Sequence, residues 1–259
     1  MHKLRFYLRQ HSQVLIVFLI GLILIIGGSF LAVLDHPNCA TVLVSVGGSL
    51  VAASLVTYLS PVSEEVYQKF LALGITDVYP SRRIIPNQQW VAWIRLARRN
   101  CTLLGIAHEN WCRDPEFPAA ITDRIRDGVE VKILFLDPTS PSGQTRAGED
   151  KGRDLLKTIR ESIKFMWDLK NDIETGARER LKLYVYNSTP SSGTLWIDSF
   201  MVVTHYLAGF ANLTSPAVIV KPVTPATESP DLYGVYAQNV QAIEGHAIEI
   251  TDANIAKYN

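Results

Sequence analysis

The 259-residue sequence predicts an α/β fold, in which an N-terminal two-helix transmembrane hairpin precedes an α/β sandwich with a mixed, mostly parallel sheet. Two stretches of 21 residues, Val14 to Leu34 and Cys39 to Leu59, contain no charged residue. From residue 75 onward, strand-like and helix-like apolar patterns alternate. The formal net charge is zero and 47% of the residues are hydrophobic, which excludes a disordered chain and argues against a dedicated duplex-DNA binder.

The two uncharged stretches have the length of membrane-spanning helices. At ~1.5 Å per residue each spans ~31 Å, which matches a hydrocarbon core of ~30 Å. The short polar break 35–38 suits a hairpin turn. Lys3, Arg5 and Arg9 precede the first stretch, whereas the break has no Lys or Arg. The positive-inside rule therefore predicts a multi-pass membrane protein with both termini in the cytoplasm.

Small residues in the second stretch predict close helix packing. Ser45, Gly47, Gly48 and Ser49 would let neighbouring helices approach closely in lipid. One interpretation is packing within the hairpin. The other is an oligomeric bundle in which Ser45 and Ser49 face a polar path.

The predicted domain boundaries are a hairpin over 1–59, a stalk helix over 60–74 and a cytoplasmic domain over 75–259. Ser63 is a candidate N-cap for the stalk, which would end near Leu73. Pro61 is expected to break the helix between the membrane segment and the stalk.

Apolar periodicity gives the elements of the third segment. Helices are predicted where apolar residues recur every three or four positions, as at Phe117, Ile121 and Ile125, and Gly128 is a suitable C-cap. Strands are predicted where short apolar runs or alternation occur. In chain order the elements are a helix over 88–99, a strand over 102–107, a helix over 116–127, a strand over 129–136, a helix over 149–173, a strand over 181–186, a hairpin over 194–197 and 200–204, a strand over 217–220 and a helix over 232–243. This alternating order favours a largely parallel centre.

The order of motifs resembles the phospholipase D-like superfamily over roughly residues 75 to 245. The segments that carry the resemblance are 74–82, 126–134, 136–138, 183–186, 196–198 and the closing helix with Tyr236 and Ile243. The resemblance implies an α/β sandwich with a cleft for phosphodiesters.

The catalytic signature of that superfamily is absent. It comprises a His, any residue and a Lys, followed by an Asp; the His attacks phosphorus and the Lys holds phosphate oxygens. None of the six histidines has a Lys two positions later; they are His2, His11, His36, His108, His205 and His246. We therefore predict no catalytic residue and a domain that is not a hydrolase of the usual mechanism.

A phosphate-binding cleft can persist without the nucleophile. In a parallel sheet the ligand crevice lies beyond the carboxyl ends of the strands. Arg can grip phosphate bidentately, and His or Tyr can stack on a base. The predicted ligand-binding residues are His108, Arg113, Thr139, Arg146, Thr204, His205, Tyr206 and Asn212. No cofactor or metal site is predicted, because Cys101 and Cys112 lack further ligands at a zinc spacing.

This plan resembles membrane effectors of bacterial antiphage signalling, of the Hailong or cyclic-nucleotide type. The resemblance implies a nucleotide or oligonucleotide messenger made by a partner nucleotidyltransferase, contact with inner-membrane lipid, and a homo-oligomeric pore, most simply a dimer of dimers. Two alternatives stay open. One is a membrane-anchored phosphodiesterase, either phospholipase or nuclease, with an altered site around His108 and His205. The other is a structural adaptor.

Overall fold

A computed structural model describes residues 2–33, 37–150, 154–206, 214–223 and 231–258. Within the first two helices, the side chains of residues 2–15, 32–33, 37, 40 and 56–65 are outside this description. The chain divides into two compact units, Met1–Lys69 and Phe70–Asn259.

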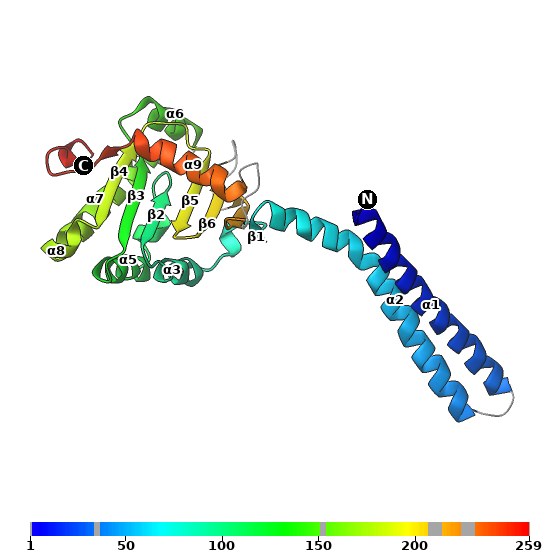
Figure 1. The fold of residues 1–259 in the computed structure, drawn as a ribbon. Helices are drawn as coiled ribbons and strands as arrows, with labels where there is room; N and C mark the ends of the chain where they lie inside the picture. The colour runs from blue at the N-terminus through cyan, green and yellow to red at the C-terminus, as the bar shows by residue number, and fades with distance from the viewer. Residues whose placement is uncertain (1, 34–36, 151–153, 207–213, 224–230, 259) are drawn as a thin grey trace. The chain divides into compact units, whose positions relative to one another are not determined.

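The first unit is built from α1 (His2–Val33) and the greater part of α2 (Pro37–Ala72) (Figure 1). The two helices approach closely at Gly21 and Gly47, where a β-carbon on Gly47 would lie 2.6 Å from the Gly21 carbonyl oxygen. The predicted break at Pro61 is wrong, since α2 continues through it. Proline removes one helical hydrogen bond, but its fixed φ is compatible with a helix. Among the described residues, no helix has both the length and the hydropathy of a membrane span.

The described part of the second unit contains one eight-stranded sheet. Two of the seven neighbouring strand pairs are parallel, β2·β3 and β3·β4, and the other five are antiparallel. In spatial order the strands are β1 (Ile75–Tyr79), β7 (Ala217–Val220), β6 (Phe200–His205), β5 (Ser192–Ile197), β2 (Asn100–Leu104), β3 (Glu130–Leu136), β4 (Leu181–Tyr186) and β8 (Ile248–Glu249).

The sheet is mixed, as predicted, but the expected mostly parallel sheet is wrong. Parallel neighbours need a long crossover, usually a helix, and only the connections β2 to β3 and β3 to β4 provide it in the parallel centre. The β5–β6 hairpin turns at Asp198 and Ser199, so these strands pair antiparallel. One half of the sheet is therefore an antiparallel extension of the three-stranded parallel centre.

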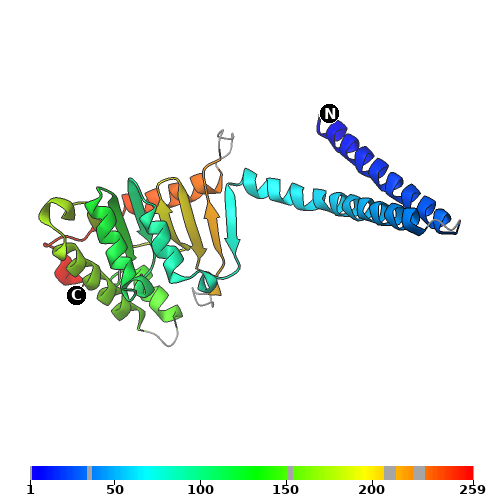
Figure 2. The same ribbon diagram turned by 90° about the horizontal axis from the view of Figure 1, so that it is seen from below.

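Helices cover both faces of the sheet (Figures 1 and 2). A layer that includes α3, α5 and α7 lies on one face, and α9 lies across the other. The helices of this unit are α3 (Asn87–Arg95), α4 (Glu109–Cys112), α5 (Glu116–Arg126), α6 (Pro141–Glu149), α7 (Leu155–Asp172), α8 (Thr175–Arg178) and α9 (Leu232–Gly245). The helix predicted over 149–173 is in fact only α7, because α6 ends at Glu149 and Asp154 caps a new helix by accepting from the Lys157 amide.

Strand alternation decides which side chains meet which helical layer. Met201 and Val203 of β6 pack with Tyr233 and Tyr236 of α9. Directly paired residues share a face, and successive residues alternate. Thr204, which pairs with Gly193, therefore faces the side of α3 and α4, whereas His205 faces α9.

Asp198 fixes the β5–β6 hairpin to the start of β2. Its φ is +42°, and its carboxylate accepts hydrogen bonds from the main-chain amides of Arg98, Arg99 and Asn100 at 2.7, 3.1 and 2.9 Å. The hairpin is thereby held against the strand at whose end the candidate site lies.

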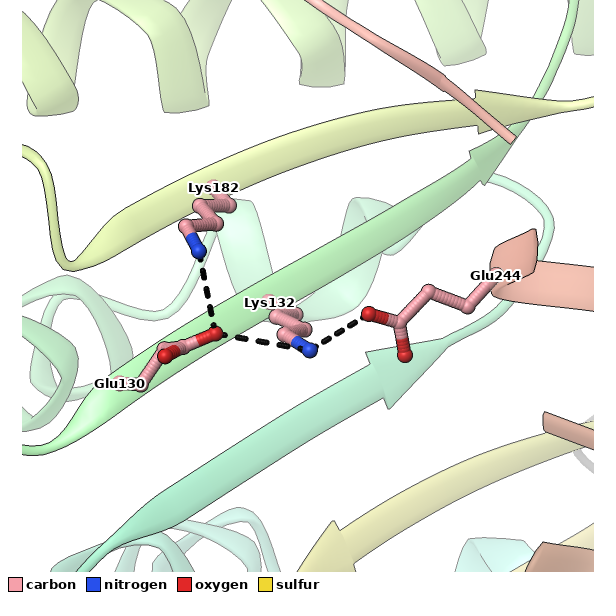
Figure 3. Close-up of polar contacts among 4 residues, drawn as sticks. All are labelled: Glu130, Lys132, Lys182 and Glu244. Atoms are coloured by element: carbon pink, nitrogen blue, oxygen red, sulfur yellow. Dashed lines mark hydrogen bonds and ion pairs between the residues drawn. The ribbon is translucent and has the colours of Figure 1, made fainter. Parts of the chain in front are cut away.

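A polar network ties the end of α9 to the parallel strands (Figure 3). Lys132 Nζ of β3 lies 2.5 Å from Glu244 Oε1 of α9 and 3.4 Å from Glu130 Oε1, which also contacts Lys182 at 3.4 Å. Burial acts to lower the pKa of Lys132, but the Glu244 and Glu130 carboxylates outweigh it, so the pKa is raised. The network holds α9 in place with balanced charge.

Candidate functional site

A pocket of about 290 Å³ lies where β2 and β6 end and β5 begins. The β1–α3 connection, α3, α4 and α6 complete its wall. Its lining residues are Arg82, Trp90, Leu104, Gly105, Ile106, Ala107, His108, Glu109, Asn110, Trp111, Arg146, Asp150, Leu155, Gly193, Thr194, Leu195, Val202, Thr204 and Tyr206.

Arg82 is held in this pocket by aromatic rings. Its Cζ lies 5.2 Å from the Trp90 ring centroid and 5.5 Å from that of Trp111. Its main-chain amide donates to the Ser215 carbonyl at 2.8 Å, which fixes the backbone after β1. Burial lowers the pKa of Arg82, although a guanidinium remains charged at neutral pH. Among the described residues, no carboxylate forms an ion pair with it, so its edge N–H groups can bind a ligand anion.

His108 is held as a neutral ring beside Arg82. It has a left-handed φ of +54°, stacks on Trp111 with a centroid distance of 5.2 Å, and meets Phe135 edge-on. Its Nε2 lies 3.0 Å from the Leu134 carbonyl oxygen. A carbonyl only accepts, so Nε2 carries the proton and Nδ1 keeps a lone pair. Burial, assisted by the Arg82 charge and opposed by the Leu134 hydrogen bond, lowers the pKa of His108 to about 4.

A second arginine and a carboxylate come from the end of α6. Arg146 is largely buried, and its NH1 lies 2.7 Å from Glu149 Oε2. Its buried Nε has no hydrogen-bond partner in the part of the chain that the structure describes. Asp150 follows directly and also lines the pocket; no hydrogen bond or ion pair joins its carboxylate to another described residue.

Tyr206 lines the pocket directly after the end of β6. Its main-chain amide donates to the Ser191 carbonyl at 2.9 Å. The Thr204 hydroxyl donates to the Gly193 carbonyl at 3.2 Å. Beneath them, the Tyr186 hydroxyl donates to the Gly105 carbonyl at 3.1 Å, and burial raises the pKa of this phenol well above its usual value. The wall is thus braced by main-chain hydrogen bonds.

The structure brings together four of the eight predicted ligand-binding residues, His108, Arg146, Thr204 and Tyr206. Arg113 does not line the pocket; its side chain is 73% exposed and pairs with Glu109 at 2.6 Å. Thr139 is also elsewhere, because its hydroxyl donates to Asp137 Oδ1 at 2.7 Å within a turn.

The prediction that His205 faces this cleft is wrong. His205 lies on the α9 face of β6, where its Nε2 is 2.9 Å from the Tyr236 hydroxyl oxygen. The strand pleat makes Thr204 and His205 point to opposite faces. His108 packs against Phe135 on the other side of the sheet, so the two histidines do not form one site. Asn212 lies outside the described residues.

The small residues of α2 that were predicted to pack together have different surroundings in the structure. Gly47 faces Gly21, whereas a β-carbon on Gly48 would have no neighbour within 4 Å. Ser45 and Ser49 are exposed, and the Ser49 hydroxyl donates to the Ser45 carbonyl of its own helix at 3.0 Å.

Sequence reasoning missed Arg82, Trp90, Trp111 and Asp150 as pocket residues. A signal for Arg82 exists: residues 78 to 108 contain five arginines and no acidic residue. An arginine that has no acidic residue nearby in the sequence is a candidate for binding an anionic group of a ligand. Nothing comparable marks the two tryptophans, whose spacing on helical segments is typical of core residues.

Comparisons with known proteins give only distant likenesses. No protein-family model matches the chain, and no curated protein matches it. The Salmonella typhimurium protein Nuc, described as a phospholipase D family member, is 15% identical over 62% of this chain and 88% of its own, with a TM-score of 0.36. TrmBL2, an archaeal chromatin protein that binds DNA, is 13% identical over 83% and 71%, with a TM-score of 0.40. Phosphatidylserine synthase from Haemophilus influenzae Rd KW20 is 14% identical over 63% of this chain and 36% of its own, with a TM-score of 0.42.

Proposed function

We propose that the second unit is a receptor for a phosphate-bearing nucleotide or oligonucleotide, which it binds without hydrolysing it. The observation that carries this proposal is the Arg82 guanidinium, which lies beside the paired rings of Trp90 and Trp111 in a pocket and has no carboxylate partner among the described residues. Removing a charge from water costs several kcal/mol unless a counter-charge compensates. A ligand phosphate would supply that counter-charge.

Two features favour binding over hydrolysis. The His-x-Lys signature is absent from the sequence, and the pocket holds one imidazole, that of His108, among its described residues. The Nε2 proton of that ring is donated to a main-chain carbonyl, and no carboxylate among the described residues orients the ring as a base. The altered phosphodiesterase remains the second candidate, because Nδ1 of His108 carries a lone pair beside Arg82.

The wider role that we propose is a membrane effector of bacterial antiphage defence. In this proposal the hairpin lies in the inner membrane, the chain forms a homo-oligomer, and the messenger controls a pore. Support comes from the two uncharged 21-residue stretches, from the resemblance to phospholipase D-like domains, and from large apolar side chains exposed on both helices, such as Ile23, Phe30 and Val42. A nucleotidyltransferase would supply the messenger.

The binding claim is tested with the full chain in detergent. Cyclic dinucleotides and short oligonucleotides are titrated by calorimetry, and the mixtures are then analysed for cleavage products. We expect binding without products, and loss of binding in Arg82→Ala. Products that disappear in His108→Asn would establish the phosphodiesterase instead. Absence of binding by any phosphate-bearing ligand would refute the receptor.

The membrane claim needs a separate measurement. The full chain is reconstituted into vesicles loaded with a self-quenched dye, and leakage is compared with and without the ligand that binds. A ligand-dependent change in leakage is expected. Binding without any change in leakage would contradict the effector role and leave the receptor intact.

A further inference from the structure

Some of the charged side chains that line the pocket form ion pairs, and others do not. Arg146 pairs with Glu149, and Glu109 pairs with Arg113, so each of these couples is formally neutral. Two lining charges remain, the Arg82 guanidinium and the Asp150 carboxylate, and no ion pair joins either to another described residue. The pocket therefore holds one cation and one carboxylate that have no ion partner among the described residues.

The surroundings of Arg82 restrict how it can bind. The Trp90 and Trp111 rings lie within 5.5 Å of its Cζ and 5.6 Å from each other, so both lie on the same side of the guanidinium, and an edge of N–H donors away from the rings stays available to a ligand. Such an edge matches two oxygens of one phosphate group. The side chain is positioned for one phosphate before a ligand arrives.

Asp150 imposes the complementary requirement. An ionised carboxylate only accepts hydrogen bonds, so a ligand must bring donors to it. Sugar hydroxyls meet this need, as in dinucleotide-binding folds where an acidic side chain accepts from a ribose hydroxyl. A second phosphate at this position would be repelled by the carboxylate.

The pocket volume limits the ligand further. About 290 Å³ lies at the lower end of the range for small-molecule pockets, ~300–1,000 Å³. This space suits one sugar–phosphate unit and not a continuous strand of several nucleotides.

We infer that the pocket recognises a single sugar–phosphate unit, with its phosphate on the edge of Arg82 and its sugar hydroxyls donating to Asp150. This inference rests on the proposed receptor function and specifies its ligand. A longer messenger would then insert one terminal unit, and the rest of it would lie outside the pocket. A phosphate linked to an amine, as in a lipid headgroup, offers similar donors and is separated from a sugar by the test.

The test uses the full chain in detergent and four probes: inorganic phosphate, methyl phosphate, ribose 5-phosphate and phosphoethanolamine. Ribose 5-phosphate is expected to bind at least about tenfold more tightly than methyl phosphate, the factor expected for one hydrogen bond to a charged group. Asp150→Asn should remove this gain and should not weaken methyl phosphate binding. Arg82→Ala should weaken every probe. Asp168→Asn, on an exposed face of α7, is the matched control and should change nothing.

The outcomes separate the inference from the proposed function. If all probes bind through Arg82 but Asp150→Asn leaves the preference for ribose 5-phosphate intact, the inference is overturned and the receptor stands. Tighter binding of phosphoethanolamine than of ribose 5-phosphate would overturn the sugar assignment in favour of a headgroup. If no probe binds, the receptor itself is overturned.

Discussion

Tyr206 lies so close to Gly193 that a β-carbon at position 193 would be 2.7 Å from the Tyr206 hydroxyl oxygen. Gly193 is therefore the residue that allows this phenol to lie across the start of β5 and form part of the pocket wall. A strand glycine often marks such a close approach.

Gly193→Ala should displace the Tyr206 ring and weaken ligand binding, while the fold persists because the contacted atom is at the end of a side chain. Calorimetry of ligand binding and the midpoint of urea unfolding measure the two effects. Gly148→Ala is the control, because its β-carbon would have no neighbour within 4 Å. Equal affinity of wild type and Gly193→Ala would show that Tyr206 does not contribute to the site.

The low pKa of His108, about 4, predicts a stability change in mild acid. The folded state disfavours the protonated ring. The neutral His108 ring therefore makes its full contribution to the free energy of unfolding above pH 6.5, and this contribution is lost as the pH falls towards 4. The slope from this group cannot exceed about 1.4 kcal/mol per pH unit, and the partial exposure of His108 should keep it below that limit.

Urea unfolding followed by tryptophan fluorescence at pH 7, 5.5 and 4.5 measures this change. His108→Asn should reduce the slope, and asparagine tolerates the left-handed backbone at this position. An identical pH dependence in the variant would exclude His108 as the titrating group.

The network of Lys132 and Glu244 should stabilise the second unit. Both side chains are about one quarter exposed, so Glu244→Gln should lower the free energy of unfolding by about 1–2 kcal/mol, between the values for surface and buried pairs. The exposed pair Lys164–Asp168 supplies the control, since Asp168→Asn should change stability by less than ~0.5 kcal/mol.

The pH dependence of this pair has a defined sign. The pKa of Lys132 is raised above its usual 10.5. The ion pair therefore contributes fully to the free energy of unfolding below pH 10.5, and this contribution is lost as the pH rises further. The difference between wild type and Glu244→Gln should therefore shrink in strongly alkaline buffer. A constant difference would indicate that Glu244 acts by packing alone.

The hairpin offers a comparison of adjacent glycines. Gly47→Leu should force α1 and α2 apart, because the Gly21 carbonyl oxygen occupies the space that the side chain needs. Gly48→Leu faces open space and should be tolerated. Thermal unfolding of the full chain in detergent, followed by circular dichroism, should show a lower Tm for Gly47→Leu alone. Equal Tm values would mean that this glycine contact does not hold the hairpin together.

Local patterns in the sequence were sufficient to predict most helices and strands of the second unit. The apolar spacing in α5 and the alternation in β3 identify their type, because each buries one face or both. Strand order is not local. The direction of β7 and the addition of β1 at the sheet edge depend on contacts between residues more than 130 positions apart, such as Tyr79 and Ala217, and no periodicity records them.

The site was only half predictable for the same reason. His108 and Arg146 follow strands and could be expected at the strand ends. The opposite directions of Thr204 and His205 depend on where β6 begins, and a shift of one residue reverses them. Arg82 enters the pocket from beyond the edge strand β1, a path that only the tertiary fold defines.

The central claim is that Arg82 binds the phosphate of a ligand, and the most direct measurement compares ligand affinity in Arg82→Ala, Arg82→Lys and Arg83→Ala. Calorimetry with the full chain and ribose 5-phosphate should show a loss of ~1.5–3 kcal/mol in Arg82→Ala, or roughly 10- to 150-fold in Kd. Arg82→Lys should restore little of it, because an ammonium cannot bind two oxygens along one edge. Arg83 is exposed outside the pocket, so Arg83→Ala should bind like wild type. Unchanged affinity in Arg82→Ala, or an equal loss in Arg83→Ala, would contradict the account.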